Sequence, residues 1–199
     1  MNYKKSFKWL GYIFFILIIL TSLDANAQVN QQATQYYNQG YDFFNKGDDE
    51  QAISYFTAAI KADPTMVNAY FYRGVSEYYL KRYNEAIKDF AEVINRDKYS
   101  SDGYLYSALT YLKLKDNNNA ISNLTQLLSL NPDDSQASYL LGSIYYNNRD
   151  NANAQKYYND AVNSVIKIAA GQGITLTADD VKKELPYYDD LAVYFLGLI

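Results

Sequence analysis

A spacing of 34 residues recurs through residues 33–166 and constrains this chain more than any other feature. One position of the repeat holds a small residue in each of its four copies, at Gly40, Gly74, Ala108 and Gly142. A second position holds alanine throughout, at Ala52, Ala86, Ala120 and Ala154. A third is bulky, at Phe56, Phe90, Leu124 and Tyr158. The copies stay in register without a gap, so the chain is expected to repeat one structural unit.

Each copy is predicted to be a pair of helices. In the first copy, apolar residues recur at three- and four-residue spacings over residues 34–46 and 50–62, with polar and helix-breaking residues between them. Gly40 and Ala52 are expected to let the two backbones approach, and Phe56 to fill the space beside them. One pair cannot bury both of its faces, so neighbouring pairs are expected to stack. The sequence therefore predicts an all-α fold.

Two further positions complete the pattern. An aromatic residue stands near the start of the first three copies, at Tyr36, Tyr70 and Tyr104, and proline closes two of them, at Pro64 and Pro132. Together these positions resemble the tetratricopeptide repeat family, whose unit is a helix–turn–helix of this length. The resemblance implies an α-solenoid of four repeats plus C-terminal helices, with the repeats at 33–66, 67–100, 101–134 and 135–168. Glu77 departs from the pattern, because tyrosine is usual at its position.

Residues 167–199 are predicted to be a C-terminal helical extension that resembles the start of a fifth repeat. The segment LAVYFLGLI (191–199) aligns with QASYLLGSI (136–144), and Thr177 with Asp180 predicts a helix N-cap. A terminal capping helix is the alternative. The apolar end of the chain is buried within the molecule, self-associates through the C-terminal helix, or belongs to a shortened reading frame, and the sequence leaves these three choices open.

Residues 1–27 have the order of a secretory signal peptide. Lysines precede an apolar run from Leu10 to Leu20, and a small-residue motif ends at Ala27. The run is shorter than the roughly 20 residues that span a bilayer. We predict cleavage between Ala27 and Gln28, no membrane insertion afterwards, and a periplasmic or secreted protein. An uncleaved N-terminal anchor is the alternative.

The composition excludes several kinds of chemistry. The chain has no cysteine and no histidine, which removes disulfides, thiolates and the commonest general base and metal ligand. Its net charge of −4 disfavours nucleic acid as a partner. Paired acids such as Asp48-Asp49 stand at predicted turns and helix starts, where carboxylates favour the helix dipole. We predict no catalytic, cofactor-binding or metal-binding residues, and hence no enzyme.

The family resemblance implies that the first helices of the repeats line a concave groove for a peptide or a partner helix. The inward positions are predicted at Tyr37, Tyr41, Phe44, Phe71, Val75, Tyr78, Leu105, Leu109, Leu112, Tyr139, Ser143 and Tyr146. Tyrosine offers a broad contact area with a polar edge. Packing between repeats is the alternative for these residues, and it is the stronger interpretation for Tyr36, Tyr70 and Tyr104.

One known ligand class is disfavoured. Family members that bind acidic C-termini of cytosolic chaperones use Lys, Asn and Arg at set positions, which here hold Tyr37, Tyr41, Tyr72, Asp102 and Tyr106. The sequence therefore favours an exported scaffold that mediates protein–protein interaction through an aromatic groove. The alternative is a glycan- or cell-wall-binding accessory module, because aromatic grooves also stack on sugar rings.

Overall fold

The computed structural model describes residues 31–184, and every regular element in that range is a helix. The predicted signal peptide with its cleavage site and the predicted helix at 191–199 lie outside these residues. The first described helix covers residues 31–45. The others are α2 (Asp49–Ala62), α3 (Val67–Tyr79), α4 (Tyr83–Arg96), α5 (Ser101–Lys113), α6 (Asn117–Leu130), α7 (Ser135–Asn147), α8 (Asn151–Gly171) and α9 (Ala178–Glu184).

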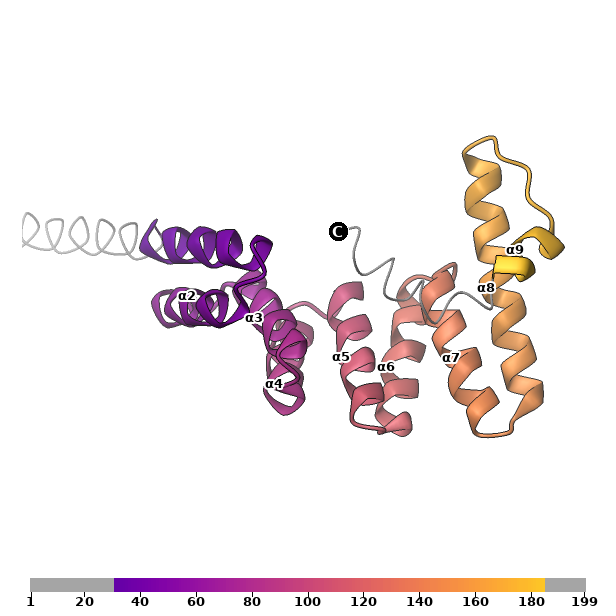
Figure 1. The fold of residues 1–199 in the computed structure, drawn as a ribbon, viewed down its shortest axis with the longest axis horizontal. Coiled ribbons are helices and arrows are strands. Elements are labelled where there is room, and N and C mark those ends of the chain that lie inside the picture. The colour runs from indigo at the N-terminus through magenta and orange to yellow at the C-terminus, as the bar shows by residue number, and fades with distance from the viewer. Residues whose placement is uncertain (1–30, 185–199) are drawn as a thin grey trace, which may run out of the picture. The chain divides into compact units, whose positions relative to one another are not determined.

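The helices pack as consecutive pairs within two compact units, which divide between Arg96 and Asp97. In the first unit, helix 31–45 pairs with α2, and α3 pairs with α4; α2 also contacts α3. In the second unit, α5 pairs with α6 and α7 pairs with α8, while α9 lies against α8 (Figure 1). The predicted all-α fold of helix–turn–helix repeats is confirmed.

The two helices of each pair are joined by the same short turn. After α5, the Lys115 N–H donates to the Leu112 carbonyl at 3.0 Å, and the Asp116 N–H donates to the Tyr111 carbonyl at 2.9 Å. This pair of bonds is the Schellman arrangement that ends many helices. The Asp116 carboxylate then accepts the Asn119 N–H at 3.1 Å and caps α6. One aspartate thus ends one helix and begins the next, as do Asp48 and Asp150.

The residue before that aspartate has a left-handed backbone. Gly47 takes this place in the first pair with φ 74°, whereas Lys115 takes it in the third with φ 60°. We expect Lys115→Gly to raise the free energy of unfolding by about 0.5–1 kcal/mol, because glycine adopts this conformation without a Cβ clash. Urea denaturation followed by circular dichroism measures the change. Lys113→Gly, two residues earlier at the end of α5, is the matched control and is expected to lower the free energy of unfolding by about 0.5–1 kcal/mol. Equal losses in both variants would contradict the prediction.

The helices of a pair approach closely at a glycine. A Cβ atom added to Gly40 would lie 2.8 Å from Cδ1 of the buried Phe56 ring on α2. Contacts this short are absent from real side chains, so only glycine fits without a shift of the ring. The predicted clearance at Gly40 is therefore confirmed. The same approach recurs between Gly74 and Phe90 and between Gly142 and Tyr158, where the distances would be 2.9 and 2.6 Å.

The predicted N-cap of the last described helix is also confirmed. The Thr177 hydroxyl oxygen accepts the Asp180 N–H at 3.2 Å, and the Asp180 carboxylate accepts the Thr177 N–H at 3.0 Å. This reciprocal pair is a capping box, which satisfies two amide groups at the start of α9. Val181 on α9 is buried, and α9 packs against α8. The cap therefore positions a short helix on the long α8.

Candidate functional site

Three aromatic side chains lie along one side of helix 31–45, because they are spaced by four and three residues. The ring centroids of Tyr37 and Tyr41 are 6.2 Å apart, with 20° between the ring planes. Those of Tyr41 and Phe44 are 6.3 Å apart, with 26° between the planes. The helix thus carries a series of nearly parallel rings at an almost constant spacing.

A fourth ring comes from the next helix pair. Tyr79, at the end of α3, stacks on Phe44 with a centroid distance of 6.3 Å and 25° between the planes. We call Tyr37, Tyr41, Phe44 and Tyr79 the aromatic row. Two helices therefore build one surface from rings that are distant in the sequence.

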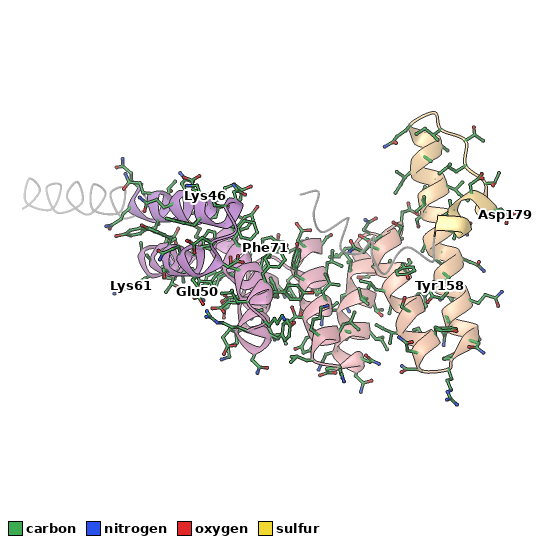
Figure 2. The ribbon with its side chains drawn as sticks, viewed as in Figure 1. Lys46, Glu50, Lys61, Phe71, Tyr158 and Asp179 are labelled. Atoms are coloured by element: carbon green, nitrogen blue, oxygen red, sulfur yellow. The ribbon has the colours of Figure 1, made fainter. Side chains whose placement is uncertain are left out.

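Tyr72 of α3 anchors the aromatic row to the core. Its ring meets Tyr41 edge-on at 5.0 Å and Phe44 edge-on at 5.3 Å. It also stacks on the buried Phe56 at 6.0 Å. Phe71, labelled in Figure 2, packs edge-on to Tyr72 from the same helix at 5.3 Å. Edge-to-face and offset-stacked contacts are the geometries that aromatic rings prefer. Tyr72 therefore holds Tyr41 and Phe44 in place against the core.

The row is accessible and uncharged. Tyr41 is 37% exposed and Tyr79 is 45% exposed, while Tyr37 and Phe44 are half-buried. Burial raises the pKa of the Tyr37 hydroxyl, and the neighbouring Tyr41 adds to this effect. The hydroxyl therefore keeps its proton at neutral pH and remains a hydrogen-bond donor. The row offers apolar ring faces bordered by hydroxyl groups.

The other predicted groove residues of the first unit lie deeper. Phe71 is half-buried, and Val75 is only 2% exposed, so it contributes to packing between helices. Tyr78 packs edge-on against Tyr83 of α4 with a centroid distance of 5.7 Å. Burial, with smaller contributions from Tyr83 and Tyr79, raises the pKa of Tyr78 to about 12. These residues support the surface more than they form it.

In the second unit, the predicted groove residues do not form such a row. Leu105 and Leu112 are half-buried, and Leu109 is 6% exposed. Tyr139 packs on Tyr158 of α8 at 5.6 Å, and the Tyr158 hydroxyl lies 3.3 Å from the Ser143 hydroxyl. Tyr146 is 63% exposed. The series of stacked rings that includes the exposed Tyr41 and Tyr79 lies in the first unit.

A second cluster, in the α3–α4 pair, is ionic. The Arg73 Nε and Nη2 groups donate to the two carboxylate oxygens of Asp89 at 2.8 and 2.7 Å, and Asp89 is buried. Glu77 is also buried, and its Oε2 atom lies 3.6 Å from Arg82 Nη1. Arg82 also pairs with Glu50 of α2. Hydrogen bonding to Asp89 raises the pKa of Arg73, so the guanidinium stays charged.

Two residues of this ionic cluster stand at repeat positions that hold aromatic rings in other helix pairs. At the corresponding positions of the first pair, Phe43 stacks on Tyr55 at 5.3 Å, and in the fourth pair Tyr145 stacks on Tyr157 at 5.6 Å. The second pair holds Glu77 and Asp89 there. A buried ion pair is weak evidence for stability but can specify how two helices align.

The sequence profile of the tetratricopeptide repeat matches residues 37–102 and 107–172, which is more than half of the chain. The chain belongs to the tetratricopeptide repeat family.

A protein of Methanocaldococcus jannaschii, MJ0572, is 38% identical over 55 residues. That match covers 28% of this chain and 64% of MJ0572, which is less than two thirds of the relative's length. A crystal structure of MamA shares the fold with a TM-score of 0.68 at 21% identity, over 69% of this chain and 81% of that one. The second tetratricopeptide domain of Spaghetti (RPAP3), solved with the HSP90 peptide SRMEEVD, has a TM-score of 0.51 at 28% identity. It covers 54% of this chain and 98% of that domain.

Other kinds of site find no support in the described part of this tetratricopeptide protein. Residues 31–184 contain no group of three Asp or Glu side chains placed to hold a metal ion. Over the same residues, none of the helices combines the length and apolar character that crossing a bilayer requires. Proteins of this family generally act as scaffolds. The aromatic row is therefore the candidate that the geometry favours.

Sequence reasoning missed two aromatic residues of this site in the tetratricopeptide chain, Tyr79 in the row and Tyr72 beneath it. Tyr79 is not among the predicted inward residues, and the sequence pattern marks Tyr72 only as a position that lacks a cation. Both residues belong to α3. Its sequence contains Tyr-Phe-Tyr and later Tyr-Tyr, which places rings on more than one side of the helix. The aromatic content of both ends of α3 was the available signal.

We expect Glu77→Gln to stabilise the protein at neutral pH. Burial is the largest cause, and it raises the pKa of Glu77. The negative charges of Asp89 and Glu85 on α4 raise this pKa further, whereas the positive charges of Arg82 and Arg73 lower it. Because the folded chain binds the Glu77 proton more tightly than the unfolded chain does, protonation of Glu77 stabilises the fold. This stabilisation is fully present below the ordinary glutamate pKa. It is lost as the pH rises through the folded pKa.

Urea denaturation at acidic and neutral pH tests this expectation. Glutamine is neutral throughout, so the gain of Glu77→Gln over the wild type should grow from acidic to neutral pH. A gain that is the same at both pH values would show that titration of Glu77 does not cause it.

Proposed function

We propose that this tetratricopeptide protein is an exported scaffold that binds an extended segment of a partner protein through its aromatic row. The observation that carries the proposal is the exposed, uncharged series of rings on helix 31–45 and α3. Large aromatic side chains with partly accessible faces are enriched where binding energy is concentrated in interfaces. A scaffold needs no catalytic group, which agrees with a sequence that lacks cysteine and histidine.

The family relationship supports a peptide as the ligand. Two domains of Spaghetti (RPAP3) with the same fold are bound to the peptide SRMEEVD, which carries three acidic side chains. In this chain, four of the five positions that would hold an acidic terminus carry tyrosine, among them Tyr37, Tyr41 and Tyr72, and the fifth carries Asp102. These rings replace cations with apolar faces. The expected ligand is therefore a peptide segment without an acidic terminus.

Export is proposed from the first 27 residues, which have the lysines, apolar run and small-residue motif of a secretory leader. Fractionation of cells that make the full chain, followed by N-terminal sequencing, tests this part. A periplasmic or secreted product that begins at Gln28 supports cleavage. An intact N-terminus in the membrane fraction would support the anchor instead, and a product that stays in the cytosol would contradict export.

The binding surface is tested by affinity capture from envelope extract with three forms of the protein: wild type, Tyr41→Ala with Tyr79→Ala, and Tyr99→Ala. Tyr99 is 81% exposed and lies outside the aromatic row, so it is the matched control. We expect a stoichiometric protein partner on the wild type and on Tyr99→Ala that is lost from the double variant. A partner that the double variant retains would place binding elsewhere. Retention of polysaccharide alone would favour the glycan-binding alternative.

A further inference from the structure

We propose that Arg82 positions the aromatic row through an ionic bridge between the first two helix pairs, and that binding by the uncharged row therefore weakens as ionic strength rises. This inference rests on the proposed function, since it concerns the regulation of the same surface. It starts from a departure in the repeat. The residue that precedes the second helix of a pair is aspartate at Asp48, Asp116 and Asp150, but it is Arg82 in the second pair.

The arginine at this position cannot do what the aspartates do. The Asp116 carboxylate accepts the Asn119 N–H and caps α6, and Asp48 and Asp150 cap α2 and α8 in the same way. A guanidinium group carries donors only, so the Arg82 side chain cannot accept an amide of α4. A helix without such a cap is less stable than one that has it. The side-chain contacts of Arg82 therefore serve something other than α4.

Arg82 connects the two helix pairs instead. Its guanidinium pairs with both carboxylate oxygens of Glu50 on α2, which Figure 2 labels, and the Nη1 atom lies 3.1 Å from Oε2. The same Nη1 atom lies 3.6 Å from Oε2 of the buried Glu77 on α3. We call Glu50, Arg82 and Glu77 the Arg82 bridge. Pairing through two parallel hydrogen bonds fixes orientation as well as distance, so the bridge ties the end of α3 to α2.

The same end of α3 supplies a ring of the aromatic row. Tyr79 follows Glu77 by two residues and precedes Arg82 by three. Its ring stacks on Phe44 of helix 31–45 with a centroid distance of 6.3 Å. The end of α3 is therefore attached to the first helix pair at two points, by an ionic contact with α2 and by a ring contact with helix 31–45. A shift of this end would change the spacing between Tyr79 and Phe44.

The second unit holds the turns of its two pairs together differently. There the Asn117 side-chain amide donates to the Asn148 side-chain carbonyl at 3.5 Å, which is a long contact between neutral groups. The two-point ionic contact of Arg82 with Glu50 thus accompanies the two pairs that share the aromatic row.

Salt acts on the bridge and not on the rings. The side chains of Arg82 and Glu50 are 42% and 60% exposed, so dissolved ions screen their attraction. Arg73 also connects the two pairs, because its Nη1 group donates to the Thr57 hydroxyl of α2 at 3.2 Å, and this contact keeps them together when the bridge is screened. Salt should therefore loosen the pairs without separating them. The affinity of the row should fall by about twofold to fivefold, the range of an exposed ion pair.

Nuclear magnetic resonance of the full chain tests the positioning without a partner. The nuclear Overhauser effect between the ring protons of Phe44 and Tyr79 reports their spacing. It is measured at about 0.01 M and about 1 M sodium chloride, where the Debye length is about 30 Å and about 3 Å. We expect the effect to weaken at high salt. Arg82→Asn should weaken it already at low salt and remove its salt dependence.

A matched control and a second variant isolate the bridge. Lys81→Asn makes the same change of charge at the neighbouring exposed residue, and it should keep the wild-type effect and its salt dependence. Glu50→Gln removes the contact with α2 and should weaken the effect as much as Arg82→Asn does. The two substitutions together should do no more than either alone, because they remove one contact.

Urea denaturation separates positioning from stability. Asparagine caps a helix as well as aspartate does, so Arg82→Asn should be at least as stable as the wild type while its ring contact weakens. A merely structural role for Arg82 predicts the opposite, a loss of stability with the ring contact unchanged. That result, or an unchanged Overhauser effect in both Arg82→Asn and Glu50→Gln, would overturn the proposal.

Affinity capture from envelope extract at the two salt concentrations tests the consequence for binding. The amount of partner held by the wild type should fall at high salt, whereas Arg82→Asn should hold the same smaller amount at both. An equal salt dependence in the two proteins would overturn the regulation. If the ring contact ignores Arg82 while Tyr41→Ala with Tyr79→Ala still loses the partner, this inference fails and the proposed function stands. If that double variant keeps the partner although the ring contact responds to Arg82, the proposed function fails and Arg82 remains a positioning residue.

Discussion

Replacement of Arg73 by methionine is expected to lower the free energy of unfolding by about 3–5 kcal/mol, the largest single effect we foresee. Arg73 donates both of its short hydrogen bonds to Asp89, whose side chain is 7% exposed. Methionine fills much of the volume but leaves the buried carboxylate without its counter-charge. An unpaired charge of this kind costs far more than the intact pair contributes. Equilibrium urea denaturation of the two proteins measures the difference.

A compensated variant distinguishes loss of the pair from loss of packing. Arg73→Leu combined with Glu77→Tyr and Asp89→Tyr removes every buried charge of this cluster and restores rings where the first and fourth pairs stack theirs. In those pairs the planes of Phe43 and Tyr55, and of Tyr145 and Tyr157, are only 9° and 4° apart. We expect this triple variant to be as stable as the wild type or more so, because apolar replacements of buried ion pairs are often neutral or stabilising. A loss near that of Arg73→Met would mean that the α3–α4 interface depends on the ions themselves.

The repeat predicted the fold of this chain because one period encodes several physical requirements together. A small residue opposite a bulky one, 16 positions apart, requires two helices that turn back on each other, and Gly40 against Phe56 shows that contact. Local signals were equally informative where the partner is near in sequence. Thr177 and Asp180 are three residues apart, so their capping box could be inferred without tertiary structure.

The site was harder to predict, because helical periodicity gives the side of a helix and not the depth of a side chain. Tyr41 and Val75 occupy equivalent repeat positions, yet Tyr41 is 37% exposed and Val75 is 2% exposed. The difference depends on the side chains of neighbouring helices, which the period does not specify. The ion pair between Arg73 and Asp89 was missed for a related reason. Sequence reasoning treated Glu77 as a departure at a single position, whereas the structure shows Arg73, Glu77 and Asp89 in one ionic cluster.

Replacement of Leu124 by phenylalanine is the second large effect, with an expected loss of about 1–3 kcal/mol in the free energy of unfolding. Leu124 is fully buried in α6, and the small residue at the matching position of α5 is Ala108, which is also fully buried. The pairs with a ring at this place all have glycine opposite it, at Gly40, Gly74 and Gly142. The Ala108 methyl group occupies the space that a phenylalanine ring would need. Urea denaturation again gives the change.

The decisive measurement is rescue by Ala108→Gly in the same chain. Glycine within a helix costs about 0.5–1 kcal/mol relative to alanine, so Ala108→Gly alone should destabilise, and the void opposite Leu124 should add to the loss. Combined with Leu124→Phe, it should restore the contact of the other pairs and recover most of the stability. A favourable coupling of about 0.5–3 kcal/mol in this double-mutant cycle is therefore expected. Additive losses would show that residues elsewhere in α5 and α6, rather than this one contact, set the distance between the helices.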